Sequence, residues 1–183
     1  MRKRFIFISA IALLLFGAAM RLLPHDPNFT PITTIALIGS LYLGKRWGLV
    51  LPVMALFLSD LVIGFYGWQI MLSVYLSFVI IGLMVWKSAK NRSVFLVGLS
   101  VISSSILFFL ITNAAVWYYS PWYEKSFSGL LYSYELGLPF FRNMLSGDII
   151  YTGGLVCIIE VAFALSRLKR QASLQPGVMA KTL

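Results

Sequence analysis

The sequence contains very few of the residues from which disulfides and metal centres are built. It has one cysteine and one histidine among 183 residues. A single cysteine, Cys157, excludes an intramolecular disulfide and any zinc site built on paired cysteines. His25 stands beside Asp26, but one such pair supplies too few ligands to indicate a metal. We therefore expect neither a metal centre nor a cofactor.

Catalytic groups are equally scarce. An intramembrane serine protease needs a nucleophile with a general base within reach, and the only histidine lies between two apolar segments. No glycine-rich phosphate loop followed by lysine occurs, so the chain has no nucleotide site of its own that could supply energy. The sequence does not predict an enzyme.

Charged residues make up only 11% of the chain, whereas 60% is apolar and 15% aromatic. A soluble fold of this size would have too little polar surface to cover itself. A membrane helix needs roughly 20 apolar residues, and the chain offers six such stretches. They predict an all-α integral membrane bundle of six helices, with one transmembrane domain over residues 1–170 and a polar cytoplasmic tail over 171–183. The expected runs are 5–23, 30–44, 47–65, 68–86, 94–119 and 144–165.

The net charge of +9 comes from short basic clusters between these runs, a pattern unlike the continuous basic face of a nucleic-acid-binding protein. If the N-terminus lies inside, 12 of the 15 basic residues fall on the inner side. These are Arg2, Lys3, Arg4, Lys45, Arg46, Lys87, Lys90, Arg92, Arg167, Lys169, Arg170 and Lys181, against Arg21, Lys125 and Arg142 outside. The positive-inside rule then predicts a multi-pass membrane protein with both termini inside.

An alternative reading concerns the first run. The basic residues 2–4, the apolar core and the small residues 17–19 also fit a cleavable signal peptide, whose removal would leave five spans.

Three prolines between residues 24 and 31 break the chain between the first two runs. Each proline lacks a backbone donor and restricts its predecessor, so no helix continues here. In a membrane protein such a break lies at the surface or lines a cavity. The next run, 32–44, has 13 residues and would reach only about 20 Å as a helix. A short, proline-interrupted span indicates a transport site; alternatively, the flanking residues simply complete the crossing.

The segment between residues 120 and 141 has helical apolar spacing and several aromatic residues, which predicts an interfacial helix on the outer surface. It would serve either as a lid over an outward-facing pocket or as an ordinary aromatic anchor.

Polar side chains near the outer ends of the spans predict a pocket there. Carboxylates at membrane depth are costly and usually face the bundle interior with a partner. The candidate solute-binding residues are Asn28, Thr30, Asp60, Asn113, Trp117, Asp148, Tyr151 and Thr152. The structural alternative is that Asp60 or Asp148 pairs with Arg21 or Arg142, and that Asn113 bonds between helices for packing alone. If the pocket exists, replacing Asp60 or Asp148 should weaken solute binding.

The run Gly44-Lys45-Arg46-Trp47-Gly48, the later Leu58-Ser59-Asp60, and Pro31, Ala36-Leu37 and Gly39 upstream resemble the substrate-specific membrane components of energy-coupling factor (ECF) transporters. A closer resemblance is to an uncharacterised bacterial family of proposed transport proteins that carries a Pro-His-x-Pro-Asn-Phe-Thr-Pro loop like residues 24–31. The resemblance implies a six-helix bundle that captures a small molecule, often a vitamin, from outside. It also implies a partner membrane scaffold and two ATPases. The first run departs from it, because no two of its small residues lie four apart as the family's Ala-x-x-x-Ala stripe requires.

Two functional hypotheses follow. The first is a solute-binding membrane component of a bacterial uptake transporter, working either with such a scaffold, with a different partner or alone. The alternative is a non-transporting accessory protein that binds lipid or another membrane subunit. In the alternative, Asp60 and Asp148 would be held in internal pairs and no small molecule would be bound.

Overall fold

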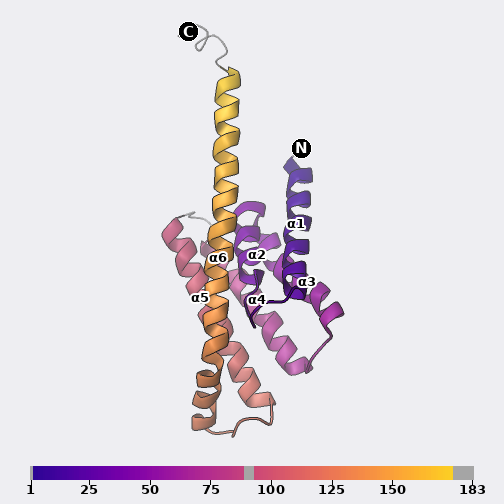
Figure 1. Cartoon of the computed structure of the whole chain (residues 1–183), viewed down its shortest axis with the longest axis vertical. Helices are drawn as coiled ribbons and strands as arrows, with labels where there is room; N and C mark the ends of the chain where they lie inside the picture. Colours follow the sequence, from indigo (N-terminus) through magenta and orange to yellow (C-terminus); the bar gives the residue numbers. More distant parts are fainter. Residues whose placement is uncertain (1, 89–92, 175–183) are drawn as a thin grey trace. The chain divides into compact units, whose positions relative to one another are not determined.

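The computed structural model describes residues 2–88 and 93–174, and this part of the chain is helical with no strand. Its helices are α1 (Arg2–Leu22), α2 (Ile32–Ile38), the π-helix η1 (Gly39–Leu43), α3 (Lys45–Ile63), α4 (Trp68–Ser88), α5 (Val94–Tyr119) and α6 (Phe127–Leu174) (Figure 1). Five of the described helices, all except α2 and η1, are long and apolar enough to cross a membrane. The prediction of an all-α fold is confirmed for the described residues, and the helices are those of a multi-pass membrane protein.

The chain divides into two compact units, residues 1–152 and 153–183, and the division falls within α6. The first unit contains α1 to α5 and the beginning of α6. In the second unit, the described residues 153–174 continue as helix. Residues 175–183 of the predicted tail lie outside the described part, as do Lys90, Arg92 and Lys181 of the predicted inner charges.

The short second span forms the centre of the first unit. Every residue of α2 is buried, and its isoleucines, Ile32, Ile35 and Ile38, are at most 1% exposed. Helices α1, α3, α4 and α5 all pack against it. Pro31 precedes its first turn, where a missing backbone donor costs nothing, and its carbonyl accepts the amide of Ile35 at 2.9 Å. The short length predicted for this span is confirmed.

Helix α2 continues into η1, whose widened turn is closed by a bond from the Gly44 amide to the Gly39 carbonyl, 2.9 Å long. Gly44 then has a φ of 110°, a left-handed conformation that glycine adopts without steric cost. This single residue turns the chain from η1 into α3. A π-helical turn is rare and often marks a functional position.

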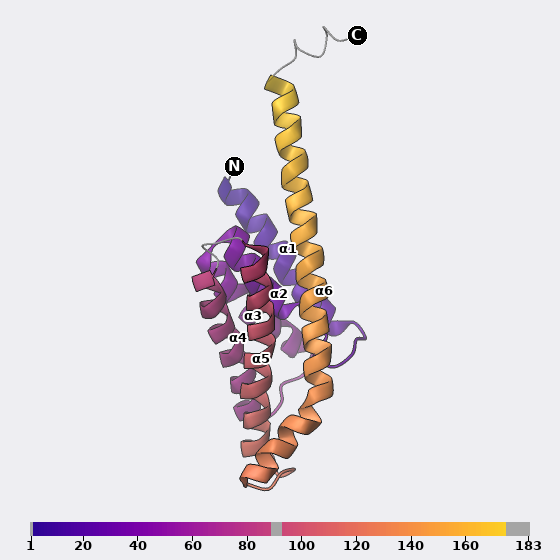
Figure 2. The same cartoon turned by 90° about the vertical axis from the view of Figure 1, so that its left-hand side faces the viewer.

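Glycines allow η1, α3 and α4 to approach one another closely. A Cβ added at Gly48 would overlap the Ser40 hydroxyl, and one added at Gly82 would lie 2.8 Å from the Gly48 carbonyl oxygen. Small residues at helix crossings permit the close backbone contacts that drive packing where lipid removes the hydrophobic driving force. The next pair of helices, α4 and α5, lies side by side (Figure 2), with Phe78 and Phe108 in ring contact at 5.2 Å.

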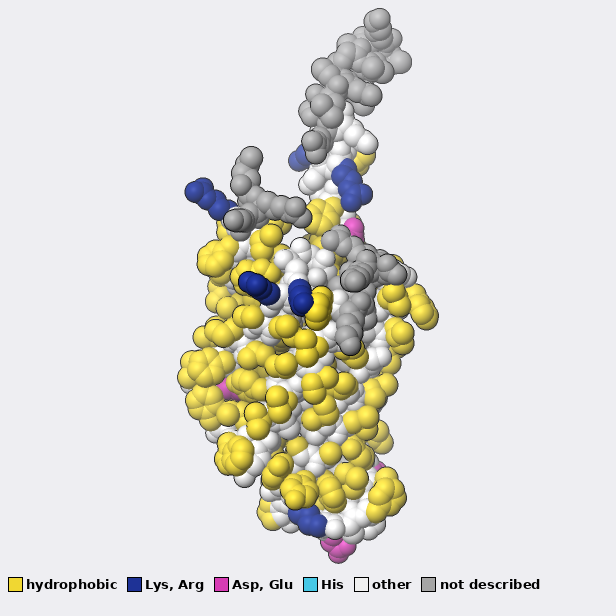
Figure 3. Space-filling view, turned by 180° about the vertical axis from the view of Figure 1, so that it is seen from behind, with side chains coloured by type: hydrophobic (Ala, Val, Ile, Leu, Met, Phe, Trp, Pro, Cys, Tyr) yellow, Lys and Arg dark blue, Asp and Glu magenta, His cyan; other side chains and the backbone are white. Residues whose placement is uncertain are grey.

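Apolar side chains cover much of the face of the first unit that Figure 3 shows. Large exposed examples occur on every long helix of this unit, including Phe5, Val62, Trp68 and Phe95. A soluble monomer rarely exposes apolar patches beyond a few hundred Å². This surface fits a lipid environment, in agreement with the helix lengths.

Helix α6 differs from the sequence prediction. An interfacial helix within 120–141 and a separate span at 144–165 were expected, but one continuous helix runs through both, with Pro139 inside it. Contacts within the first unit explain the continuity, because residues on both sides of the proline are held in place. Before it, the Tyr134 ring lies 5.4 Å from that of Phe109. After it, Asn143 donates a 3.2 Å hydrogen bond to the Pro27 carbonyl.

Candidate binding cavity

The loop after α1 is shaped by its prolines and by a left-handed residue. Asn28 has a φ of 65°, and it is the one residue other than glycine with positive φ in the described part of the chain. Two short turns lie around Asn28. The Phe29 amide donates a hydrogen bond to the Asp26 carbonyl, and the Thr30 amide donates one to the Asn28 carbonyl, both at 3.0 Å. Asparagine is one of the few residues that tolerates this conformation. The loop therefore holds Asn28 and Thr30 in fixed positions.

These two residues line a cavity of about 250 Å³ in the first unit. One part of its wall is polar and consists of Arg21, His25, Asn28, Thr30, Thr33 and Tyr66. The other part is apolar and consists of Ile32, Leu56, Val74, Phe78, Phe108 and Met144. No acidic residue of the described chain lines it. Mixed walls of this kind are typical of small-molecule sites, in which apolar surface holds the body of a ligand and a few polar groups orient it.

Arg21 reaches from the last turn of α1 to the end of α3. Its Nη1 atom lies 2.8 Å from Asp60 Oδ1 and donates to Ser59 Oγ at 2.5 Å and to the Leu56 carbonyl at 3.2 Å. Asp60 is 1% exposed, and Arg21 retains 17% exposure. A buried carboxylate requires such a partner, because an unpaired charge at this depth is very costly. The ion pair therefore ties α1 to α3 beside the cavity.

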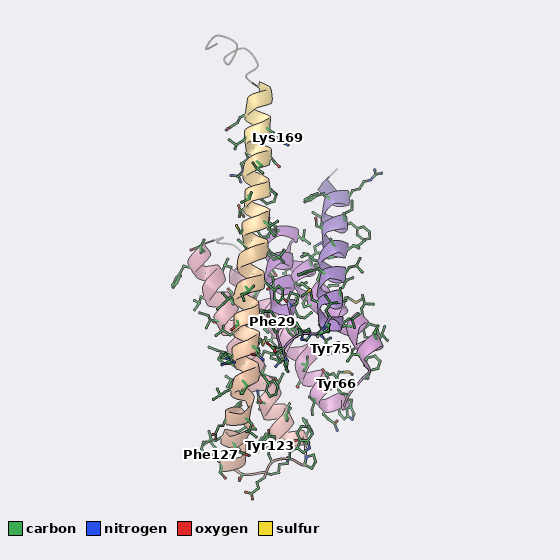
Figure 4. All side chains as sticks on the ribbon, in the orientation of Figure 1. Phe29, Tyr66, Tyr75, Tyr123, Phe127 and Lys169 are labelled. Carbon is green, nitrogen blue, oxygen red and sulfur yellow. The ribbon has the colours of Figure 1, made fainter. Side chains whose placement is uncertain are left out.

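Two tyrosines extend this network from the α3–α4 connection and from α4 (Figure 4). Tyr75 donates its hydroxyl to Asp60 Oδ2 at 2.8 Å. Tyr66 lies in the connection and lines the cavity. Burial raises the pKa of the Tyr66 phenol, the nearby Asp60 carboxylate raises it further, and Arg21 partly opposes both effects. Tyr66, 40% of which is exposed, therefore stays a neutral phenol in the cavity wall.

Asp148 forms a second polar cluster, between α2, α5 and α6. It is fully buried, and one carboxyl oxygen accepts the Ser105 hydroxyl at 2.8 Å. The hydroxyl of Thr33 lies beside this carboxyl. The hydroxyls of Thr34 and Thr152 form a hydrogen bond of 2.9 Å. Of this cluster, only Thr33 lines the cavity.

The remaining predicted residues take other positions. Tyr151 packs its ring against Phe29 of the proline loop at 5.4 Å. Asn113 bonds the Phe109 carbonyl on its own helix, and Trp117 Nε1 donates to the Glu124 carbonyl at 2.8 Å. Trp117 thus contacts the segment that leads into α6, and Asn113 lies against Gly137 of α6 itself. The structure does not bring them to the cavity.

Among the eight predicted residues, Asn28 and Thr30 line the cavity, and Asp60 lies behind Arg21. Sequence reasoning missed Arg21, His25 and Tyr66 as lining residues. The available signal for Arg21 was its place as a lone cation at the predicted outer end of a span, directly before the proline loop. Within the described chain, no three His, Cys, Asp or Glu side chains gather where they could hold a metal ion.

The fold and this cavity define a class: a helical multi-pass membrane protein with a small, partly polar cavity inside its bundle. The chain belongs to the DUF6580 family, a family of unknown function, which it matches over residues 1–172. No curated protein and no solved structure matches it.

Proposed function

We propose that the protein is the solute-binding membrane component of a bacterial uptake system and binds a small molecule in the cavity beside α2. One observation carries the proposal: a cavity of about 250 Å³ joins a polar wall to an apolar wall inside a membrane protein. A space of this size would hold on the order of eight waters at liquid density. The ligand is therefore smaller than a typical drug-sized molecule.

The surroundings of the cavity support a transport role over a purely structural one. Its wall includes the proline loop and the start of the short, buried α2. Interrupted or shortened helices at membrane depth are typical of transporter binding sites, because their ends present backbone and polar groups to a solute. The sequence carries no nucleotide site, so energy would come from a partner or from an ion gradient.

The resemblance to the substrate-specific components of ECF transporters suggests which partner that is. In that arrangement, a membrane scaffold and two ATPases would drive release of the solute to the inside of the cell, and the protein would lie in the inner membrane. The charge distribution supports entry from the outside, because the proline loop is flanked by few basic residues.

The second candidate is an accessory membrane protein that binds lipid or another subunit. One observation favours it: Asp60 is held by Arg21 and Tyr75, and Asp148 is bonded to Ser105, so both carboxylates have internal partners. The cavity favours the first candidate, because packing alone does not require an open space lined by six polar residues.

The two candidates are distinguished by filling the cavity. Val74 lines it, whereas Val62 on α3 is 71% exposed. Native mass spectrometry of gently purified protein should show a retained small molecule. Val74→Phe should reduce its occupancy at least about tenfold, because a ring in place of an isopropyl group occupies ligand space and overpacks the wall. Val62→Phe, the same change on the exposed surface, should leave occupancy unchanged. Absence of any retained solute, or equal retention in both variants, would refute solute binding in this cavity.

A further inference from the structure

We infer that the solute is a small organic anion, a carboxylate or phosphate on an apolar body, and that Arg21 binds its charged group. This inference rests on the proposed function and names the class of ligand. It starts from the charge of the cavity wall, which carries the Arg21 guanidinium and no acidic residue of the described chain. Low-dielectric walls lined by one sign of charge favour a ligand of the opposite sign.

The contacts of Arg21 leave part of its guanidinium free. All its protein contacts use one atom, Nη1, which faces Asp60, Ser59 and the Leu56 carbonyl. Within the described chain, Nη2 and Nε make no hydrogen bond. A guanidinium carries five N–H donors in a planar fork, so the edge formed by Nη2 and Nε keeps three of them. That edge matches the two oxygens of a carboxylate or phosphate.

Asp60 acts as a positioning residue for Arg21 and does not line the cavity. It is fixed in turn by the Tyr75 hydroxyl on its other oxygen. A free arginine side chain loses conformational entropy when a ligand immobilises it. The ion pair with Asp60 already holds one end of the guanidinium, so less entropy is lost on binding. The pair thus prepares the opposite edge of Arg21 for an anion.

Further donors and an apolar wall complete the site. The side chains of Asn28 and Thr30 also line the cavity. An amide and a hydroxyl can donate hydrogen bonds to a second oxygen of the anion. The rings of Phe78 and Phe108 and the side chain of Met144 form the apolar wall. They suit a ring or a short hydrocarbon chain, and aromatic rings and the methionine sulfur give such a body favourable contacts.

The experiment compares three probes of nearly the same shape: benzoate, benzylammonium and benzyl alcohol. Their binding is measured by titration calorimetry on the full chain in phosphatidylcholine nanodiscs. Benzoate should bind more tightly than the other two. Replacing Arg21 alone would leave Asp60 buried without a partner, so the test variant is the double replacement Arg21→Gln with Asp60→Asn, which removes both charges and keeps polar groups in both places. It should weaken benzoate binding at least about tenfold, since hydrogen bonds to charged groups contribute that much.

Two controls separate charge from structure. Asp60→Asn alone should weaken benzoate binding by no more than about threefold, because an amide oxygen at this position still accepts a hydrogen bond from Arg21 and keeps the guanidinium in place. If Asp60 itself bound the ligand, Asp60→Asn would abolish binding. Arg142→Gln removes the same charge from an exposed position that does not line the cavity, and should leave affinity unchanged.

If benzoate binds no more tightly than the other probes, or binds the double variant as well as the native protein, the anion assignment is wrong. Retention of a solute that depends on Val74 would still support the proposed function in that case. Nanodiscs containing phosphatidylglycerol test a lipid source for the anion. They should leave benzoate affinity unchanged; competition by this lipid would assign Arg21 to a headgroup and overturn capture of a free solute.

Discussion

At the scale of single residues, the Arg21–Asp60 pair links the stability of the bundle to its cavity. Asp60 is almost completely buried, so losing Arg21 would leave a charge without compensation, a change that costs about 3–5 kcal/mol in buried pairs. The same arginine lines the cavity. One side chain therefore stabilises the contact between α1 and α3 and supplies the charge of the candidate site.

Tyr66 gives a prediction about pH. Its pKa is raised above the ordinary value of 10.0, first by burial and then by the Asp60 carboxylate. The folded protein thus binds this proton more tightly than the unfolded chain does. The resulting stability is fully present below about pH 10 and is lost as the pH rises through the folded-state pKa. Between about pH 9 and about pH 11, the melting temperature of the native protein should fall further than that of Tyr66→Phe.

The comparison with Tyr66→Phe isolates this group, because the other tyrosines titrate in both proteins. Melting curves in one detergent, recorded in steps across this pH range, would measure the difference. Parallel falls in the two proteins would show that Tyr66 has the same pKa folded and unfolded.

A site residue could be predicted where neighbouring residues in the sequence fix its position, and could not be predicted where contacts between helices fix it. Asn28 and Thr30 were predictable because the prolines around them fix a loop that no distant contact needs to create. The pairing of Arg21 with Asp60 depends on how α1 crosses α3, which spacing within one helix does not specify. Trp117 was predicted to line the pocket, yet its partner is the segment leading into α6.

At the scale of helices, the crossing of α3 and α4 depends on glycine. A Cβ at Gly82 would lie 2.8 Å from the Gly48 carbonyl oxygen and also 2.8 Å from the Leu49 side chain, so α4 would have to move away from α3. We expect Gly82→Ala to destabilise the protein by about 1–3 kcal/mol, the usual cost of overpacking. Unfolding of the purified protein in increasing denaturant would measure the loss.

Gly98 on α5 is the matched control, because an added Cβ there meets nothing within 4 Å. Alanine is the better helix former by up to about 1 kcal/mol, so Gly98→Ala should leave stability unchanged or raise it slightly. Equal effects of the two substitutions would show that the close approach of α3 and α4 contributes nothing to stability.

The helices themselves were largely predictable, since the runs at 47–65, 68–86 and 94–119 correspond to α3, α4 and α5 within a few residues. The error in α6 has a physical cause. Pro139 and the polar residues Arg142 and Asn143 look like a helix boundary in sequence. A proline in a helix removes one hydrogen bond and causes a local clash, which tertiary contacts on both sides can outweigh. The contacts of Tyr134 before the proline and Asn143 after it are of this kind.

At the scale of the whole molecule, the membrane class followed from composition because it depends on the sum of many residues and on no single contact. With 60% apolar residues, the chain has enough apolar surface both to fill a core and to cover much of the outside of the first unit. The cavity could not be read from composition, because it depends on where packing is incomplete. Its residues come from α1, the proline loop, α2, α3, α4, α5, α6 and the α3–α4 connection.

The orientation of the molecule in the membrane decides from which side the cavity would receive a solute. The 12-to-3 division of basic residues predicts that the loop before α3 lies inside and the loop after α5 outside. Cys157 is the only cysteine, so Cys157→Ser gives a background for placing single cysteines. In intact cells, a membrane-impermeant maleimide should label Trp122→Cys, and it should label Arg46→Cys only after permeabilisation.

Both positions are exposed in the structure, so lack of labelling would not result from burial. Labelling both cysteines after permeabilisation provides the control for reactivity. The reverse pattern would place the proline loop inside the cell, because each crossing of the membrane changes side and this loop is one crossing away from Arg46 in the predicted topology. The protein would then receive its ligand from the cytoplasm, and capture from outside would be wrong even if the cavity binds an anion. Labelling of Trp122→Cys alone in intact cells would instead put Arg21, Asn28 and Thr30 on the side from which an uptake system takes its solute.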